Sequence, residues 1–152
     1  MIVERLQILD IPEFVRLAEM MHAEGHFSFV PFNARKLEKH VHGMVANGAG
    51  RHICLSVKQD GQIIGGYLGF VNDYFFGDGD YLGDKGMYVE PGKRGSMAAV
   101  MLQGAIMEWA KEKGVLEVLQ GVQNGDDAEK ADKFFRHAGY EYLGGNYAKR
   151  VM

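Results

Sequence analysis

The segment from Met87 to Ala99 constrains the fold most, because its pattern changes from strand to helix within a few residues. Apolar residues stop at Val89, and Pro91 and Gly92 then supply turn chemistry. Beyond the turn, apolar residues recur at helical spacing, at Met97, Val100, Met101, Ala105 and Trp109. The segment therefore predicts a strand, a tight turn and a helix in direct succession.

The first turn of that helix is expected to bind a diphosphate. The start of a helix presents unpaired backbone N–H groups and the positive end of a dipole, and both attract anions. Arg94 adds a full positive charge, and Gly95 lets a ligand approach the backbone closely. An ordinary strand–turn–helix with a surface arginine is the plainer alternative.

Length and composition bound the class of protein. The chain has 152 residues, which suits a single domain over 1–152 with a sizeable core. A net charge of −3 gives no basic footprint for nucleic acid, so no nucleic-acid partner is expected. No apolar run reaches membrane-spanning length and no signal peptide is recognised, so no membrane partner is expected either. The single cysteine, Cys54, suits a reducing cytoplasm.

Periodicity and turn signals give the order β-α-α-β-β-β-α-β-α-β-β. Strands are expected over 1–9, 52–58, 63–71, 81–89, 115–122, 140–143 and 147–151. The first helix starts with the capping pattern of Asp10 and ends at Gly25, and Asn33 caps the second, which Gly48 stops. The third ends at Gly114 and the fourth runs over 126–138. Residues 26–32 are expected to form an aromatic-rich loop, which either forms one wall of a pocket or packs in the core or at a dimer contact. The fold class is α/β, a mixed central sheet flanked by helices.

The pattern Val89-x-Pro91-x-x-Arg94-Gly95-x-x-x-Ala99 resembles the acetyl-CoA loop of the GNAT superfamily of N-acetyltransferases. The pattern departs from the family at Met97, where glycine is usual. The Met97 side chain is expected to point into the core. The element order also resembles that of the GNAT fold, and Gly139-Tyr140 resembles the family's closing Gly-Phe feature. The run Pro-x-x-Arg-Gly-Ser followed by Ala-Ala is associated with bacterial and phage members.

The resemblance implies a set of residues that bind acetyl-CoA. The strand edge before the loop would pair with the pantetheine arm, and the N–H near Met87 would polarise the thioester carbonyl. The expected cofactor-binding residues are Met87, Tyr88, Val89, Arg94, Gly95, Ser96, Met97, Ala98, Ala99, Asn124 and Phe134. Asn124 has a second interpretation as a turn residue, because it precedes Gly125.

The acid and base are less determined by the sequence. The tyrosine that acts as general acid in the family aligns with Phe135, which cannot donate a proton. Tyr140, Tyr88 or a water could protonate the departing thiolate instead, or the reaction could proceed without a general acid. An amine must lose a proton before it attacks, and Asp84 lies where the family often places an acidic base. Other carboxylates expected near the substrate are Asp73, Asp78, Asp80 and Glu24. The expected catalytic residues are Asp84, Met87 and Tyr140.

The leading hypothesis is an acetyl-CoA-dependent N-acetyltransferase that acetylates a primary amine directly, in a ternary complex. No convincing nucleophile is present for a covalent intermediate, and no metal site is expected, because His22 and His26 do not form a metal-binding motif. The alternatives are a non-catalytic acyl-CoA-binding module and an interaction domain. The acceptor would be a small-molecule or peptide amine. Because homodimers are common in the family, the resemblance also allows a homodimer.

Overall fold

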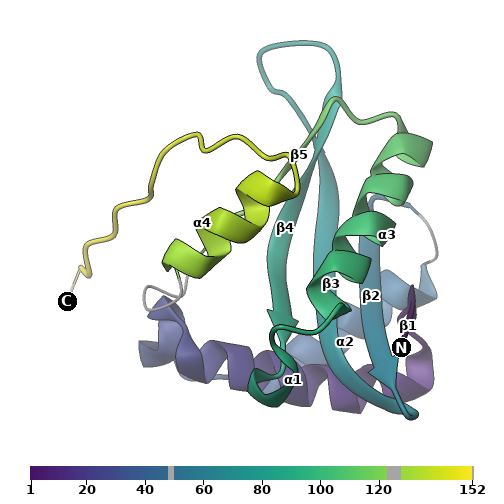
Figure 1. The fold of residues 1–152 in the computed structure, drawn as a ribbon. Helices are drawn as coiled ribbons and strands as arrows, with labels where there is room; N and C mark the ends of the chain where they lie inside the picture. The colour runs from purple at the N-terminus through teal and green to yellow at the C-terminus, as the bar shows by residue number, and fades with distance from the viewer. Residues whose placement is uncertain (48–49, 123–127, 152) are drawn as a thin grey trace. The chain divides into compact units, whose positions relative to one another are not determined.

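The computed structural model describes residues 1–47, 50–122 and 128–151, which divide into two compact units, Met1–Gly121 and Val122–Met152. Figure 1 shows the helices and strands in chain order. They are β1 (Ile2–Arg5), α1 (Ile11–Glu24), α2 (Ala34–Ala46), β2 (His52–Gln59), β3 (Gln62–Asp73), β4 (Asp80–Val89), α3 (Ala98–Lys113), β5 (Glu117–Leu119) and α4 (Ala128–His137). Short 3-10 turns cover Ile8–Asp10, His26–Phe29 and Pro91–Lys93.

The expected caps and turns position several of these elements. The Asn33 side chain accepts a hydrogen bond from the Lys36 N–H at 2.9 Å and so starts α2. Gly114 ends α3 in the left-handed region, with φ of 70°. The β2–β3 hairpin turns through Asp60 and Gly61, both with positive φ. Gly48, the expected stop of α2, lies outside the described residues, and α2 itself ends at Ala46.

The first unit contains a five-stranded sheet with the order β1-β2-β3-β4-β5. The pairs β1–β2, β2–β3 and β3–β4 are antiparallel, whereas β4 and β5 are parallel and are joined through α3. The expected α/β class with a mixed sheet is confirmed. Among the described residues, no helix is long and apolar enough to cross a membrane.

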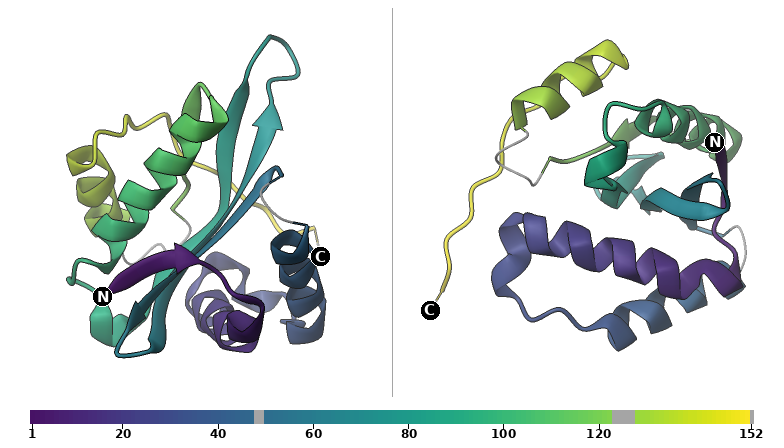
Figure 2. Two further views of the ribbon diagram at one scale, coloured as in Figure 1. Left: turned by 90° about the vertical axis from the view of Figure 1, so that its right-hand side faces the viewer. Right: turned by 60° about the horizontal axis from the view of Figure 1, so that its bottom comes forward.

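Helices cover both faces of this sheet, as Figure 2 shows. One core lies between the sheet and α3 and includes Tyr67, Leu82, Leu102 and Ile106, all fully buried. The other lies between the sheet and the helices α1 and α2, and includes Phe14, Leu17 and Val41. β3 runs between the two cores, so its side chains are buried on both faces.

Glycines in β3 let neighbouring groups approach the sheet closely. A Cβ on Gly66 would lie 2.6 Å from the Phe14 ring and 3.2 Å from the Leu55 carbonyl oxygen. We therefore expect Gly66→Ala to lower the free energy of unfolding by about 1–3 kcal/mol, because α1 must shift away. Gly43→Ala is the matched control, since nothing lies within 4 Å of its Cβ position in α2 and alanine favours helix. Thermal unfolding should show Gly66→Ala melting lower than the native chain and Gly43→Ala melting at the same temperature or higher.

The second unit corrects the sequence-based order at its end. The strands expected over 140–143 and 147–151 are not formed, and this unit's described residues contain α4 and no strand. Tyr142, Leu143, Tyr147 and Val151 are exposed. A two-stranded hairpin is only marginally stable without a further strand or a buried face. The described residues of this unit supply neither to residues 140–151.

Candidate active site

The loop between β4 and α3 leaves the backbone accessible at the start of α3. A 3-10 turn over Pro91–Lys93 is followed by Gly95, whose φ of 85° lies in the left-handed region. A Cβ at Gly95 would have no atom within 4 Å, so the space beside this backbone is open. Glycine is therefore needed here for its conformation and also leaves room for a ligand.

Backbone N–H groups at the start of α3 are available to an acceptor. The Ala98 N–H donates to the Ser96 hydroxyl oxygen at 3.3 Å. Among the described residues, the N–H groups of Met97, Ala99 and Val100 have no backbone acceptor. Unsatisfied amides at the positive end of a 16-residue helix form an anion-binding arrangement.

Met97 corrects the expectation that its side chain points into the core. Its side chain is 59% exposed and does not enter the core, where Ala98 packs instead with no exposed surface. The sequence pattern could not separate these two positions, because both continue the apolar run into α3. The Met97 backbone is helical, with φ of −73° and ψ of −3°, so the missing family glycine does not distort the start of α3.

Arg94 lies beside this loop and is engaged within the protein. Its Nη2 donates to a carboxylate oxygen of Glu24 at 2.7 Å, and its Nε donates to the Val89 carbonyl oxygen at 2.9 Å. The guanidinium also lies over the Tyr88 ring, 5.1 Å from its centroid. The expected charge is therefore present at the loop, but a carboxylate from the end of α1 balances it.

The strand before the loop has one edge without a strand partner over its last half. β4 pairs with β5 only at Tyr81, Leu82 and Gly83. Opposite Leu68 and Gly69 of β3, β4 carries an extra residue, Lys85, and this bulge bends the strand. Within the described residues, β4 is thus unpaired on its β5 side from Asp84 to Val89.

The backbone of Met87 faces that unpaired edge. The Glu90 N–H bonds to the Ile64 carbonyl oxygen of β3, and backbone groups alternate between the two edges of a strand. The N–H groups of Val89 and Met87 therefore point away from β3. The Arg94 contact with the Val89 carbonyl oxygen agrees with this direction.

Asp84 sits where β4 and β5 separate. Its carboxylate oxygens accept hydrogen bonds from the Gly121 N–H, which follows β5, at 3.3 and 3.4 Å. Burial raises the pKa of the Asp84 carboxyl to about 6, even though the Gly121 hydrogen bond acts in the opposite direction. A carboxylate with this pKa is ionised near neutral pH and can still accept a proton, as a general base must.

Two glutamines form a contact that the sequence did not predict. Gln103, a buried residue of α3, and Gln120, which follows β5, exchange amide hydrogen bonds of 2.9 and 3.1 Å. The Gln103 amide also donates to the Met87 sulfur at 3.4 Å. The pair thus joins α3 to both strands near the point where they separate. No local motif marks such a contact.

Three expected site residues cannot be placed beside β4. Asn124 lies outside the described residues. Phe134 and Tyr140 belong to the second unit, where both rings pack on Phe135 at centroid distances of 5.4 Å. Their assigned roles stay predictions.

Cys54 and Asp80 are two further residues with possible chemical roles. Cys54 is buried, and burial raises the pKa of its thiol to about 11, which disfavours the nucleophilic thiolate. Asp80, at the start of β4, pairs with Arg51 at 3.7 Å. Among the described residues, no group of three or more histidine, cysteine or acidic side chains could hold a metal ion.

A protein-family model described as the acetyltransferase (GNAT) family matches residues 17–140. Solved structures share the fold at low identity. AAC(6')-Iy, in complex with the bisubstrate analogue CoA-S-monomethyl-acetylneamine, is 18% identical with a TM-score of 0.75, over 99% of this chain and 98% of that one. Glucosamine-6-phosphate N-acetyltransferase from Arabidopsis thaliana is 14% identical with a TM-score of 0.77, over 99% and 98%.

A third structure has the same fold with another kind of substrate in its name. The ribosomal-protein-alanine N-acetyltransferase from Brucella melitensis is 14% identical with a TM-score of 0.71, over 99% of this chain and 100% of that one. No curated protein matches the chain in sequence.

Proposed function

Because the chain belongs to the acetyltransferase (GNAT) family, we propose that it moves an acetyl group from acetyl-CoA to a primary amine by direct attack in a ternary complex. The observation that carries the proposal is the row of N–H groups at the start of α3, directly after the unpaired edge of β4. The family model runs through both units, which supports one acetyltransferase domain over residues 1–152.

The chain's own residues fit the diphosphate and pantetheine of coenzyme A. The N–H groups of Met97, Ala99 and Val100 would donate to the diphosphate, and Gly95 leaves space for it. The unpaired edge of β4 would bond to the pantetheine amides as an added strand would. Bound there, acetyl-CoA would supply an activated acetyl thioester.

Two groups on β4 would carry the chemistry. The Met87 N–H points from the unpaired edge and would donate to the thioester carbonyl oxygen, where negative charge develops during attack. The Asp84 carboxylate would take a proton from the acceptor's ammonium group, and the resulting amine would form the new C–N bond as the C–S bond breaks. After the attack, the nitrogen would give up its remaining excess proton, which water would carry to the sulfur of the departing thiolate, so that the products are a neutral amide and a free thiol.

The acceptor is proposed only as a class. The related structures are named as N-acetyltransferases of an aminoglycoside, of glucosamine-6-phosphate and of ribosomal-protein alanine. Because these names have only N-acetylation in common, we carry over the amine alone.

The test is release of free thiol from acetyl-CoA in the presence of different amines. The panel contains an aminoglycoside, glucosamine-6-phosphate, a peptide with an N-terminal alanine, a polyamine and a lysine peptide. We expect thiol release that saturates with at least one amine and yields its acetylated product by mass spectrometry. Binding of acetyl-CoA without thiol release for any amine would support the non-catalytic module instead.

A further inference from the structure

Arg94 occupies a site that is suited to any organic cation. A carboxylate oxygen of Glu24 lies 2.7 Å from its Nη2, the Val89 carbonyl oxygen lies 2.9 Å from its Nε, and the Tyr88 ring lies under the guanidinium. A negative charge, a carbonyl acceptor and an aromatic face are the three groups by which proteins recognise ammonium ions. These three residues, Glu24, Tyr88 and Val89, are called the cation site below.

The cation site lies on the part of β4 that is expected to bind the cofactor. Tyr88 and Val89 follow Met87 directly, and Glu24 is the last residue of α1. The Glu24 carboxylate also affects the Tyr88 hydroxyl. Burial, together with this nearby negative charge, raises the pKa of Tyr88. The side chains of Arg94 and Glu24 are 36% and 35% exposed, so the ion pair is open to competition from solution.

A diphosphate at the start of α3 would compete with Glu24 for Arg94. Arg94 precedes Met97 by three positions in the sequence, and the Met97 N–H belongs to the proposed diphosphate site. Arginine binds phosphate oxygens in the same forked geometry as carboxylates, and a diphosphate carries more charge than one carboxylate. An ion pair that is about one-third exposed contributes little to stability, so its exchange costs little.

We propose that Arg94 leaves the cation site for the cofactor's diphosphate. The Val89 carbonyl oxygen then becomes available to pantetheine, and the Glu24 carboxylate and the Tyr88 ring receive a second cationic group of the acceptor, distinct from the amine that Asp84 deprotonates. This inference rests on the proposed function. It makes Glu24 a residue that selects cationic acceptors and makes their binding depend on the cofactor. Arg94 acts as an internal cation that fills the site until the diphosphate is present.

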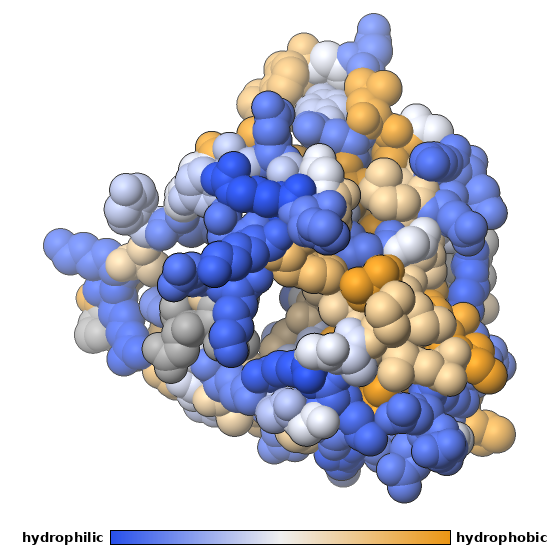
Figure 3. Space-filling view, in the orientation of Figure 1, coloured by the Kyte–Doolittle hydropathy of each residue, from blue (hydrophilic) through white to orange (hydrophobic). Residues whose placement is uncertain are grey.

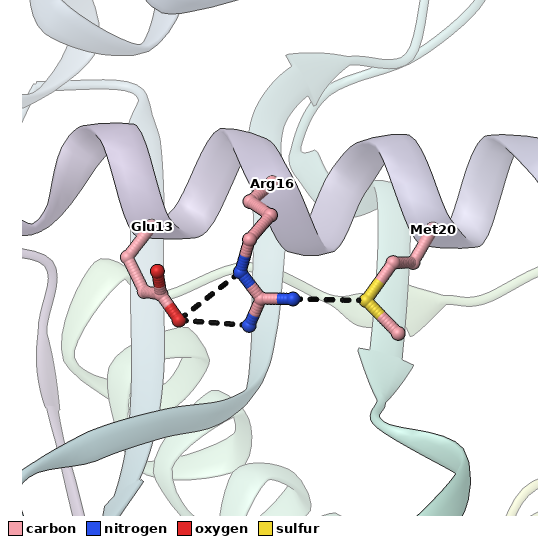
Figure 4. A network of polar contacts seen from close by, with 3 residues as sticks. All are labelled: Glu13, Arg16 and Met20. Atoms are coloured by element: carbon pink, nitrogen blue, oxygen red, sulfur yellow. Dashed lines mark hydrogen bonds and ion pairs between the residues drawn. The ribbon is translucent and has the colours of Figure 1, made fainter.

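The first test measures coenzyme A binding by calorimetry in Glu24→Gln. Removing the carboxylate removes the competitor for Arg94, so we expect coenzyme A to bind roughly fivefold more tightly than to the native chain. Glu13→Gln is the matched control, because Glu13 also lies on α1 and also pairs with an arginine, Arg16, at 2.7 Å. Figure 4 shows that pair, with Met20 beside it, within one helix.

The control separates partner exchange from general electrostatics. Both substitutions remove one negative charge from α1, and coenzyme A is an anion. Glu13 lies 11 residues before Glu24, about 16 Å along the helix, so its effect should be much smaller. A double-mutant cycle adds a second control. In an Arg94→Ala background, Glu24→Gln should change coenzyme A affinity no more than Glu13→Gln does.

The second test measures the acceptor. For an amine that gives thiol release and carries a second cationic group, Glu24→Gln should raise KM about tenfold and leave kcat within about twofold, because a binding contact is lost and the base is not. Activity confined to amines without a second cationic group would overturn the acceptor role. An unchanged amine KM would overturn the acceptor role of Glu24. Equal coenzyme A affinities in the native chain and Glu24→Gln, or the same gain in the Arg94→Ala background, would overturn the partner exchange. A native chain that binds no coenzyme A would instead refute the proposed function.

Discussion

Replacing Asp84 by asparagine should slow acetyl transfer at least about 100-fold at pH 7 and, at the same pH, stabilise the fold. The rate falls because asparagine cannot take the proton from the acceptor, and general bases contribute about 100-fold to 10,000-fold. The side-chain carbonyl oxygen of the introduced asparagine can still accept from the Gly121 N–H, so the geometry where β4 and β5 separate should be kept.

The stability gain follows from the sign of the pKa shift. The pKa of Asp84 is raised in the folded state to about 6 from 3.8, so the folded protein holds this proton more tightly than the unfolded chain. The free energy of unfolding therefore falls as pH rises from about 4 to about 6 and stays lower above that range. Asparagine removes this dependence, and we expect a gain of up to about 2 kcal/mol at pH 7.

The pH–rate profile of the native chain gives the same information independently. The logarithm of kcat/KM should rise with pH and level off near pH 6, the point at which Asp84 loses its proton. Asp80→Asn is the control, because Asp80 lies at the start of the same strand and pairs with Arg51. An Asp84→Asn variant with native activity and an unchanged profile would remove Asp84 as the base.

Replacing Met97 by aspartate should abolish most of the coenzyme A binding without weakening the fold. Met97 is the N-cap of α3, its side chain is 59% exposed, and it makes no capping hydrogen bond there. Aspartate is a strong N-cap and favours the positive end of the dipole, so the free energy of unfolding should rise by about 0.5–1 kcal/mol. The same carboxylate would repel a diphosphate and compete for its N–H donors, which we expect to weaken binding about 100-fold.

Met97→Asn separates charge from shape. Asparagine caps a helix as well as aspartate and has nearly the same size, but it carries no charge. Both side chains compete for the N–H donors, but only aspartate also repels the diphosphate, so calorimetry should show a much smaller loss of coenzyme A affinity for Met97→Asn than for Met97→Asp. Equal affinities in the two variants would mean that the diphosphate does not lie at the start of α3.

Most of the fold could be predicted because its signals are local. The caps at Asn33 and Gly114, the turn at Gly61 and the strand-to-helix change after Val89 are each written within a few residues. The strands expected over 140–143 and 147–151 failed for the opposite reason. Their alternation is local, but a strand also needs a partner, and the described part of the second unit supplies none.

The candidate site was predictable only where its chemistry belongs to the backbone. The start of α3 and the edge of β4 follow from element order, so the sequence placed them. Side-chain contacts between distant residues left no pattern to read, as with Arg94 and Glu24, 70 positions apart, or Asp84 and Gly121, 37 apart. Exposure was equally hidden, because Met97 and Ala98 look alike in an apolar run but only Ala98 is buried.

Exposed apolar groups also gather at the start of α3. Met97 and Val100 are 59% and 49% exposed beside the unsatisfied N–H groups. Figure 3 shows apolar side chains on the side of the sheet that α3 covers, bordered by hydrophilic residues. A ligand that joins a diphosphate to apolar and aromatic parts, as coenzyme A does, would use both features.

Titration of the native chain with coenzyme A in a calorimeter tests the central claim most directly. If the N–H groups at the start of α3 bind the diphosphate, the heat should saturate at one coenzyme A per chain. Pantetheine, which lacks the diphosphate, should bind far more weakly. A folded protein that gives no saturable heat at millimolar coenzyme A, or that binds pantetheine equally well, would contradict the account.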